Sequence, residues 1–289
     1  MMWRLTEREA LPEERNSTSA DRRCHRSNER ADRDSRGSTT RPDLVTGLPT
    51  SRECVVREFK VGSAEVGDHV VLYARATLSG SQRMDVSLRH AQQQKIARIL
   101  WNRGLFPSNR TTGSHGFMQD VRVVRTSLGK PLLCVAGEFH GGLSFSQTTG
   151  RLWAALAKDG LDVGIDAAEP LEFTGPYPFE RVFGELEWRA WFDSGHETYP
   201  ESAALVWSCK EAVAKAFGCG FHLIEPLDIG IVPRGKCGEG IASRACLSDR
   251  TLRRFPALRS ATIAVVSFRE CHAWVSIALA EDHIEGLRR

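Results

Sequence analysis

The sequence lacks the common signals that would assign it to a class at once. Its eight cysteines form no Cys-x-x-Cys pair, and no His pair follows at zinc spacing, so a structural zinc site is not indicated. No apolar run is long enough to span a bilayer, and the first residues carry no apolar segment of a secretory signal. No P-loop, dinucleotide fingerprint or nucleophile elbow occurs. The net charge is only +3, which does not indicate a nucleic-acid binder.

The composition is that of a globular protein with a real core. At 289 residues and 41% hydrophobic content, the chain can form one large domain or two smaller ones. Several cysteines fall inside apolar runs such as Leu133–Val135, so we expect reduced, mostly buried thiols. We therefore expect a cytoplasmic protein that contacts neither a membrane nor nucleic acid.

Residues 1–52 differ from the rest of the chain. They are rich in Arg, Asp, Glu, Ser and Thr, with few apolar residues and no helical or strand period. Such a segment cannot bury enough apolar surface to offset its ordering entropy, which predicts a disordered tail. A nucleic-acid tail and an organellar transit peptide are the alternatives, and the interleaved acidic residues count against both.

The pattern after residue 52 predicts an α+β fold with two similar lobes, residues 53–160 and 161–289. Each lobe is expected to pack a helix on a mainly antiparallel sheet. Helices are predicted at 87–103, 179–192 and 202–217, from apolar residues at helical spacing. Strands are predicted at 70–74, 121–124, 132–136, 143–146, 151–156, 162–165, 227–232, 262–267 and 273–280.

The most informative segment is Trp207–Lys215, within the third predicted helix. Trp207, Glu211 and Lys215 are four residues apart, which puts an aromatic ring, a carboxylate and an ammonium on one helix face. A second acidic signal is Asp166, at the end of the apolar stretch Val163–Ile165. A strand-end Asp and a helix Glu are oxygen ligands of the kind that Mg²⁺ prefers. Each feature alone has a plainer explanation, a turn cap for Asp166 and a surface ion pair for Glu211 with Lys215.

Together these segments resemble the 4′-phosphopantetheinyl transferase superfamily, in its two-lobed, monomeric, surfactin-synthetase-activating type. That family has a G-[VI]-D strand motif, matched by Gly164–Asp166, and a W-x-x-K-E-[AS]-x-x-K helix motif, matched by Trp207–Lys215. Gly129–Pro131 matches its G-K-P, and Leu143–Ser146 is a weaker match to the segment that usually holds Ser-His-Ser.

The resemblance implies a holo-carrier-protein synthase built of two similar lobes, with the active site between them. Such an enzyme transfers the 4′-phosphopantetheine arm of coenzyme A, its co-substrate, to a serine of an acyl or peptidyl carrier protein. Asp166 and Glu211 would bind Mg²⁺, and Glu211 and Lys215 would be catalytic, as general base and as the cation that steadies phosphate charge. The resemblance implies coenzyme A contacts at Lys130, Ser144 and, more weakly, Lys210. Lys95 and Arg98 of the first helix are candidates for the same phosphates, or else belong to a solvated face.

Two positions depart from the family pattern and support an alternative function. Phe145 replaces the family histidine and cannot contact a phosphate, although His140 and Arg151 lie close in sequence. Ala168 stands where many relatives carry a second strand Glu, and Glu169, one residue later, is expected to point away unless the strand bulges. The alternative is a non-catalytic relative that binds carrier proteins and has a degraded cofactor site. The sequence does not indicate which carrier protein is served or whether acyl-coenzyme A is accepted.

Overall fold

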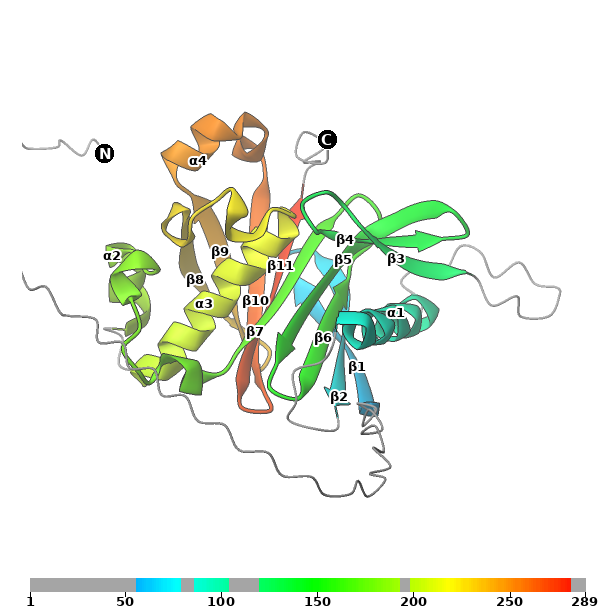
Figure 1. Cartoon of the computed structure of the whole chain (residues 1–289). Helices are drawn as coiled ribbons and strands as arrows, with labels where there is room; N and C mark the ends of the chain where they lie inside the picture. Colours follow the sequence, from blue (N-terminus) through cyan, green and yellow to red (C-terminus); the bar gives the residue numbers. More distant parts are fainter. Residues whose placement is uncertain (1–55, 79–85, 104–119, 193–197, 282–289) are drawn as a thin grey trace, which may run out of the picture. The chain divides into compact units, whose positions relative to one another are not determined.

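The computed structural model describes residues 56–78, 86–103, 120–192 and 198–281, so the predicted tail at residues 1–52 lies outside the described residues. Two antiparallel sheets and their helices make an α+β fold, as predicted (Figure 1). The first sheet has the strand order β1-β2-β6-β5-β4-β3. Its strands are β1 (Val56–Val66), β2 (His69–Leu78), β3 (Val121–Arg125), β4 (Pro131–Val135), β5 (Glu138–Thr148) and β6 (Arg151–Leu156).

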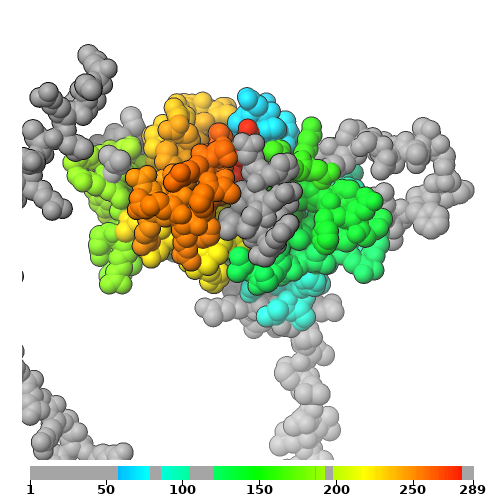
Figure 2. Space-filling view, turned by 90° about the horizontal axis from the view of Figure 1, so that it is seen from above, coloured from blue at the N-terminus to red at the C-terminus, as the bar shows by residue number. Residues whose placement is uncertain are grey.

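The second sheet has the strand order β7-β11-β10-β9-β8. Its strands are β7 (Asp162–Ala168), β8 (Ile229–Cys237), β9 (Gly240–Leu247), β10 (Thr262–Glu270) and β11 (Ala273–Glu281). The long helix α3 (Tyr199–Ala216) packs on this sheet, and the short helix α4 (Asp249–Arg254) follows β9. Seen from above, α4 in orange and the strands β3–β5 in green appear on the same face (Figure 2).

The helix of the first lobe, α1 (Val86–Arg103), packs on β6, β3 and β2. It buries Ile96, Ala97 and Leu100, which recur at helical spacing and join a core cluster of the first sheet. Among the helices that the structure describes, none combines the length and the apolar character needed to cross a membrane.

The two sheets meet along β5 and β7. Trp153 and Ala155 of β6 join Val163 and Ile165 of β7 in one buried cluster, so apolar side chains of both sheets share a core. All seven residues of β7 are buried, because α3 covers one face of the strand and this cluster covers the other. The strand that carries Asp166 is therefore held on both sides.

Helix α3 approaches β7 so closely that only a glycine fits at one position. A Cβ atom added to Gly164 would lie 1.8 Å from the carbonyl oxygen of Ala212 and 2.6 Å from the amide nitrogen of Ala216. The glycine of the Gly164–Asp166 motif thus has a packing reason, which is contact between the backbones of strand and helix.

The predicted helix at 179–192 is wrong in form. The chain there makes a 3₁₀ turn at Phe179–Arg181, one α-turn (α2, Glu185–Glu187) and a π-turn at Trp188–Phe192. Gly184 is extended, with φ −79° and ψ 161°, and interrupts any continuous helix. The apolar spacing that suggested a helix reflects a cluster of aromatic rings, such as Trp188 stacked on Phe192 at 4.3 Å. Strands β1 and β9 and helix α4 were not predicted.

Lys210 is a core residue of the second lobe, which corrects its prediction as a phosphate contact. Its side chain has no exposed surface, and its ammonium pairs with Glu187 Oε2 at 2.6 Å. The same Nζ donates to the carbonyl oxygens of Pro226 (2.9 Å) and Ile229 (2.7 Å). Burial lowers the pKa of Lys210 and raises the pKa of Glu187. The attraction between the two opposite charges opposes both shifts. The ion pair joins α3 to α2, and the two hydrogen bonds join α3 to the start of β8.

We expect Gly164→Ala to destabilise the protein by about 1–3 kcal/mol, because the added methyl pushes α3 away from β7. The matched control is Gly175→Ala, where a Cβ atom meets nothing within 4 Å. Urea unfolding followed by circular dichroism measures both. Equal unfolding midpoints for the two variants would show that α3 can move away from β7 without loss of stability, which would contradict the prediction.

We expect Lys210→Met to cost about 3–5 kcal/mol of unfolding free energy, because it leaves the buried Glu187 carboxylate without its cation. Adding Glu187→Gln should recover part of that loss, since a neutral amide can still accept the N–H of Ile231, which Glu187 accepts at 2.8 Å. The comparison uses urea midpoints of the single and double variants. A double variant less stable than Lys210→Met alone would contradict the ion-pair explanation.

Candidate active site

Three predicted site residues meet where α3 lies against β7. Asp166 of β7 accepts hydrogen bonds from Lys215 Nζ at 2.5 Å and from Ser146 Oγ at 2.7 Å. The same Nζ lies 3.8 Å from Glu211 Oε2, one helical turn earlier on α3. The two predicted metal ligands, Asp166 and Glu211, therefore both lie beside the ammonium of Lys215. Glu211 and Lys215 are also the predicted catalytic pair.

The electrostatics of this group suit a divalent cation. Burial raises the pKa of Glu211, and the nearby charge of Asp166 raises it further, while Lys215 opposes the shift. Two partly buried carboxylates that repel each other and share one cation form a hard oxygen donor set of the kind that takes Mg²⁺, with water or phosphate as the remaining ligands. The donor set thus fits the predicted metal, with Asp166 and Glu211 as its holders.

The third carboxylate of many relatives has no direct counterpart here. Ala168 is buried at that position, and the described residues contain no group of three or more His, Cys, Asp or Glu side chains that could hold a metal. Glu169 follows the strand, and its Oε1 is buried without a hydrogen-bond partner. Partial burial raises the pKa of Glu172, and the charges of Glu169 and Asp166 add to that shift. Glu172 therefore lies within electrostatic reach of Asp166.

Tyr177 is a neighbour of this group that the sequence did not indicate. Its ring contacts that of Trp207, with centroids 6.4 Å apart and an edge-on angle of 76°. Burial raises its pKa to about 12, and the charges of Glu211 and Glu172 contribute. The hydroxyl therefore keeps its proton at neutral pH. Trp207 is partly buried and packs against the core of the second lobe.

The Ser-Phe-Ser segment of β5 connects the two sheets. Ser144 Oγ accepts the N–H of Ile165 at 3.1 Å, and Ser146 Oγ accepts the N–H of Ala167 at 3.3 Å while donating to Asp166. Both serines face β7, whereas Phe145 packs against the apolar cluster of the first lobe. Ser144 also lines the cleft described next, and Ser146 orients the Asp166 carboxylate.

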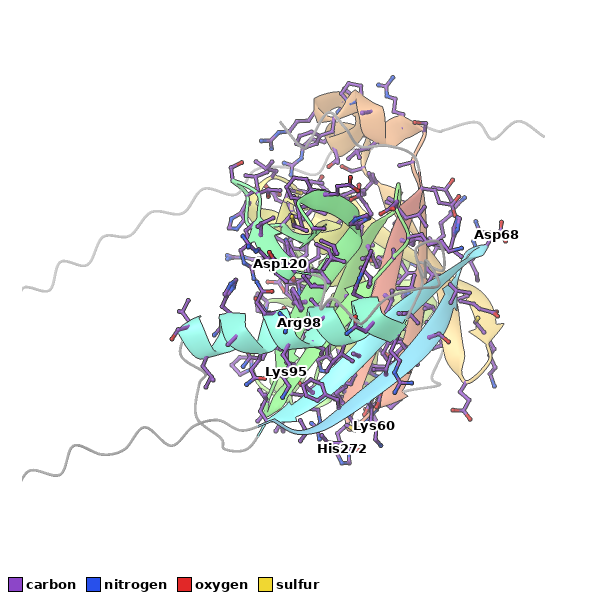
Figure 3. All side chains as sticks on the ribbon, turned by 90° about the vertical axis from the view of Figure 1, so that its right-hand side faces the viewer. Lys60, Asp68, Lys95, Arg98, Asp120 and His272 are labelled. Carbon is purple, nitrogen blue, oxygen red and sulfur yellow. The ribbon has the colours of Figure 1, made fainter. Side chains whose placement is uncertain are left out.

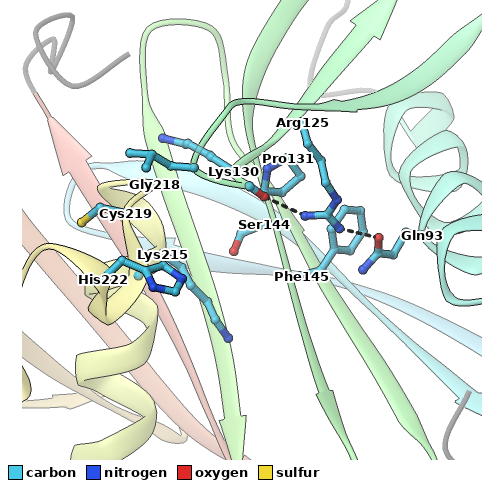
Figure 4. Close-up of a pocket in the computed structure, with 13 residues that line it drawn as sticks. Gln93, Arg125, Lys130, Pro131, Ser144, Phe145, Lys215, Gly218, Cys219 and His222 are labelled. Carbon is cyan, nitrogen blue, oxygen red and sulfur yellow. Dashed lines mark hydrogen bonds between the residues drawn. The ribbon is translucent and has the colours of Figure 1, made fainter. Parts of the chain in front are cut away.

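A cleft of about 210 Å³ lies beside this group (Figure 4). Residues from α1, the β3–β4 hairpin, β5 and the end of α3 line it, so both lobes contribute. Its basic side chains are Arg125, Lys130, Lys215 and His222. Phe145 and Pro131 supply an apolar part of the wall. This combination can accept an anionic ligand that has an apolar or aromatic portion.

Lys130 lines this cleft, but its ammonium is engaged inside the protein. Nζ forms an ion pair with the buried carboxylate of Asp162 and donates to the carbonyl oxygen of Ala216 at 2.8 Å. The residue is 7% exposed. Lys130 thus connects the hairpin of the first lobe to β7 and to the end of α3.

Lys95 and Arg98 do not line the cleft. Both are exposed on α1, where Figure 3 labels them, and Lys95 Nζ lies 5.1 Å from the ring centroid of Phe59. The residue that α1 turns toward the cleft is Gln93, which is buried. Lys95 lies two positions after Gln93, which places it on nearly the opposite side of a helix with 3.6 residues per turn. This geometry matches the alternative of a solvated face.

Arg125, the last residue of β3, is a further basic group of the cleft that the sequence analysis missed. It donates to Gln93 Oε1 and to the carbonyl oxygen of Gly129, both at 2.7 Å (Figure 4). Its place directly after the predicted strand 121–124, on the hairpin that carries Gly129–Pro131, is the signal that could have identified it.

Comparison with family models agrees with the sequence resemblance. Residues 162–260 match the family model described as 4′-phosphopantetheinyl transferase superfamily. No curated protein matches the chain. One similar solved structure is the holo-[acyl-carrier-protein] synthase of Thermotoga maritima, with 22% identity over 42% of this chain and a TM-score of 0.31. The chain spans 64% of that protein's length.

A second similar structure is the ACPS-CoA complex of Chronobacterium ammoniagenes, with 21% identity, a TM-score of 0.33, and coverage of 43% of this chain and 99% of that one. The matched segment 162–260 contains Asp166, Glu211 and Lys215, the three side chains that meet at β7 and α3. The part of the chain that carries this group is therefore the part that matches the 4′-phosphopantetheinyl transferase superfamily model.

Proposed function

We propose that the protein transfers the 4′-phosphopantetheine arm of coenzyme A to a serine of an acyl or peptidyl carrier protein. The observation that supports this most is the joining of Asp166, Glu211 and Lys215 at one end of a basic cleft between the two sheets. A pyrophosphate needs cations along its length, and a serine hydroxyl needs a base within reach. The group beside the cleft offers both.

In this proposal each residue has a defined part. Asp166 and Glu211 hold Mg²⁺, which when bound neutralises charge on the pyrophosphate of coenzyme A. Glu211, one helical turn before Lys215 on the same helix face, is the candidate general base that accepts the proton of the incoming serine. Lys215 places its ammonium where charge grows on the leaving oxygen. Ser146 fixes the orientation of Asp166.

The reaction forms one bond and breaks one. The serine oxygen of the carrier attacks the phosphorus that bears the pantetheine arm, and the bond from that phosphorus to the bridging oxygen of the pyrophosphate breaks. The carrier keeps the arm as a phosphodiester, and adenosine 3′,5′-bisphosphate leaves.

The direct test is the intact mass of purified apo acyl and peptidyl carrier proteins after incubation with the enzyme, Mg²⁺ and coenzyme A. A mass gain equal to one phosphopantetheine arm, lost when the acceptor serine is replaced by Ala, supports the transferase. Binding of carrier proteins with no mass gain on any of them supports the alternative, a non-catalytic carrier-binding relative, for which Phe145 in the cleft is the structural argument.

We expect Glu211→Gln to lower turnover by about 10²–10⁴-fold, because the amide cannot accept the serine proton. The side chain keeps its size, so the melting temperature should change little. Steady-state kinetics on the modified carrier measures the effect, with Glu138→Gln, an exposed Glu on β5, as the matched control. A loss below about threefold would instead assign Glu211 to a surface ion pair.

We expect Asp166→Asn to weaken divalent-metal binding by about tenfold or more, since one of two charged ligands is lost. Electron paramagnetic resonance of Mn²⁺, a probe for Mg²⁺, measures this without turnover. Asp159→Asn, an exposed Asp outside the group, is the control. Unchanged Mn²⁺ affinity in a folded Asp166→Asn variant would remove Asp166 from the metal site.

A further inference from the structure

The ring of Tyr177 is held in place by other aromatic rings. It is half-buried, and the centroids of the Phe173, Phe179 and Trp207 rings lie 4.9, 5.1 and 6.4 Å from its own. The three rings meet it at interplanar angles of 59°, 59° and 76°. A ring that packs against three others keeps its orientation, so the hydroxyl of Tyr177 has a defined position.

That hydroxyl is directed to the side of α3 that carries Glu211. Trp207 precedes Glu211 by one helical turn, and helix side chains lean toward the N-terminus, so the Glu211 carboxylate extends toward the turn against which Tyr177 packs. In agreement, burial raises the pKa of Tyr177 to about 12, and the charges of Glu211 and Glu172 contribute. Within the part of the chain that the structure describes, the hydroxyl forms no hydrogen bond, so its O–H is available to a ligand.

The cleft and Tyr177 lie on opposite sides of Glu211 along α3. Lys215, one turn after Glu211, lines the cleft, and the cleft wall continues past the end of the helix (Figure 4). Tyr177 contacts Trp207, one turn before Glu211, and the 3₁₀ turn Pro170–Phe173 of the same segment packs on α3. Glu211 therefore separates a basic side from an aromatic side.

The chemistry of the proposed transfer assigns a substrate to each side. In phosphoryl transfer the attacking and leaving oxygens lie roughly in line, on opposite sides of the phosphorus. If adenosine 3′,5′-bisphosphate leaves into the cleft beyond Lys215, the acceptor serine arrives from the other side of Glu211. That is the side on which Tyr177 lies.

A serine hydroxyl in this place has one hydrogen-bonding position left. It offers one donor and two acceptor positions. During the transfer its proton goes to Glu211 and one lone pair attacks the phosphorus, so the second lone pair needs a donor. The ammonium of Lys215 is engaged with Asp166 at 2.5 Å, whereas the O–H of Tyr177 has no acceptor among the described residues.

Resting on the proposed function, we propose that Tyr177 donates its O–H to the acceptor serine of the carrier protein and so directs the attacking lone pair at the phosphorus. Tyr177 keeps its own proton throughout, and the proton of the serine passes to Glu211. The bonds formed and broken are those of the transfer itself.

The experiment measures binding without turnover. Isothermal titration calorimetry gives the affinity of the full-length protein, with Mg²⁺ and adenosine 3′,5′-bisphosphate, for an apo carrier that the wild-type protein binds and for the same carrier with its acceptor serine replaced by Ala. Tyr177→Phe should weaken binding of the apo carrier by about fivefold, the size of one neutral hydrogen bond. It should change binding of the Ala carrier by less than about twofold, because the lost bond is already absent there.

Two further measurements separate this role from a structural one. Tyr177→Phe should lower kcat by about fivefold and leave the KM for coenzyme A within about twofold, since coenzyme A occupies the other side of Glu211. The matched control is Tyr199→Phe, a 40% exposed tyrosine of the same aromatic cluster, whose ring packs on Phe179 and Trp188. This control should change neither carrier affinity nor kcat.

Equal weakening for both carriers in Tyr177→Phe, or no weakening for either, would overturn the assignment of Tyr177. A loss confined to coenzyme A would place Tyr177 on the cofactor side and overturn it as well. A wild-type protein that neither binds nor modifies any carrier would refute the proposed function, and this inference with it, so the two failures are distinguishable.

Discussion

The close approach of α3 to β7 is the constraint on which the site depends. Gly164 has no Cβ, so the backbone of α3 can lie against the strand at Ala212 and Ala216. Asp166 lies two residues further along β7, on the same strand face as Gly164, and Glu211 and Lys215 each precede one of the contact alanines. The three charged side chains are therefore brought together by backbone packing. In the strand motif, Gly164 lets the helix approach, and Asp166 is thereby placed beside the charged side chains of that helix.

Buried polar contacts then fix the rotation of α3. Beneath the helix, Ser208 Oγ lies 2.7 Å from Ser276 Oγ, which in turn lies 2.8 Å from Ser267 Oγ. Cys209 Sγ lies 3.2 Å from Ser267 Oγ, and burial raises the pKa of this thiol to about 11, so it stays protonated. With the Lys210 ion pair, these contacts join the helix to β10, β11 and β8. A helix bonded at successive residues cannot rotate freely, so Glu211 keeps its direction.

The sequence predicted the elements whose apolar period is regular. Both long helices and most strands were found because one side of each faces a core, and the motifs on β7 and α3 supplied the three central site residues. Around Trp188, where aromatic rings pack on one another, the spacing of apolar residues along the sequence did not predict the secondary structure correctly. Stacking between rings does not require a helical period. The edge strand β1 and the strand β9 alternate polar and apolar residues weakly and gave too faint a signal.

The roles of the basic residues could not be predicted, because a role depends on burial and on partners distant in sequence. Lys210 adjoins Glu211 in the helix motif, yet its partner Glu187 is 23 residues earlier and turns it into the core. Lys130 is matched to Asp162, 32 residues later. A buried ammonium is tolerated only when it is paired with an opposite charge. These two lysines therefore have a structural role. Lys215 and Arg125 keep exposed surface. The positive charge on the wall of this cleft is therefore supplied by basic side chains that are not buried in the core.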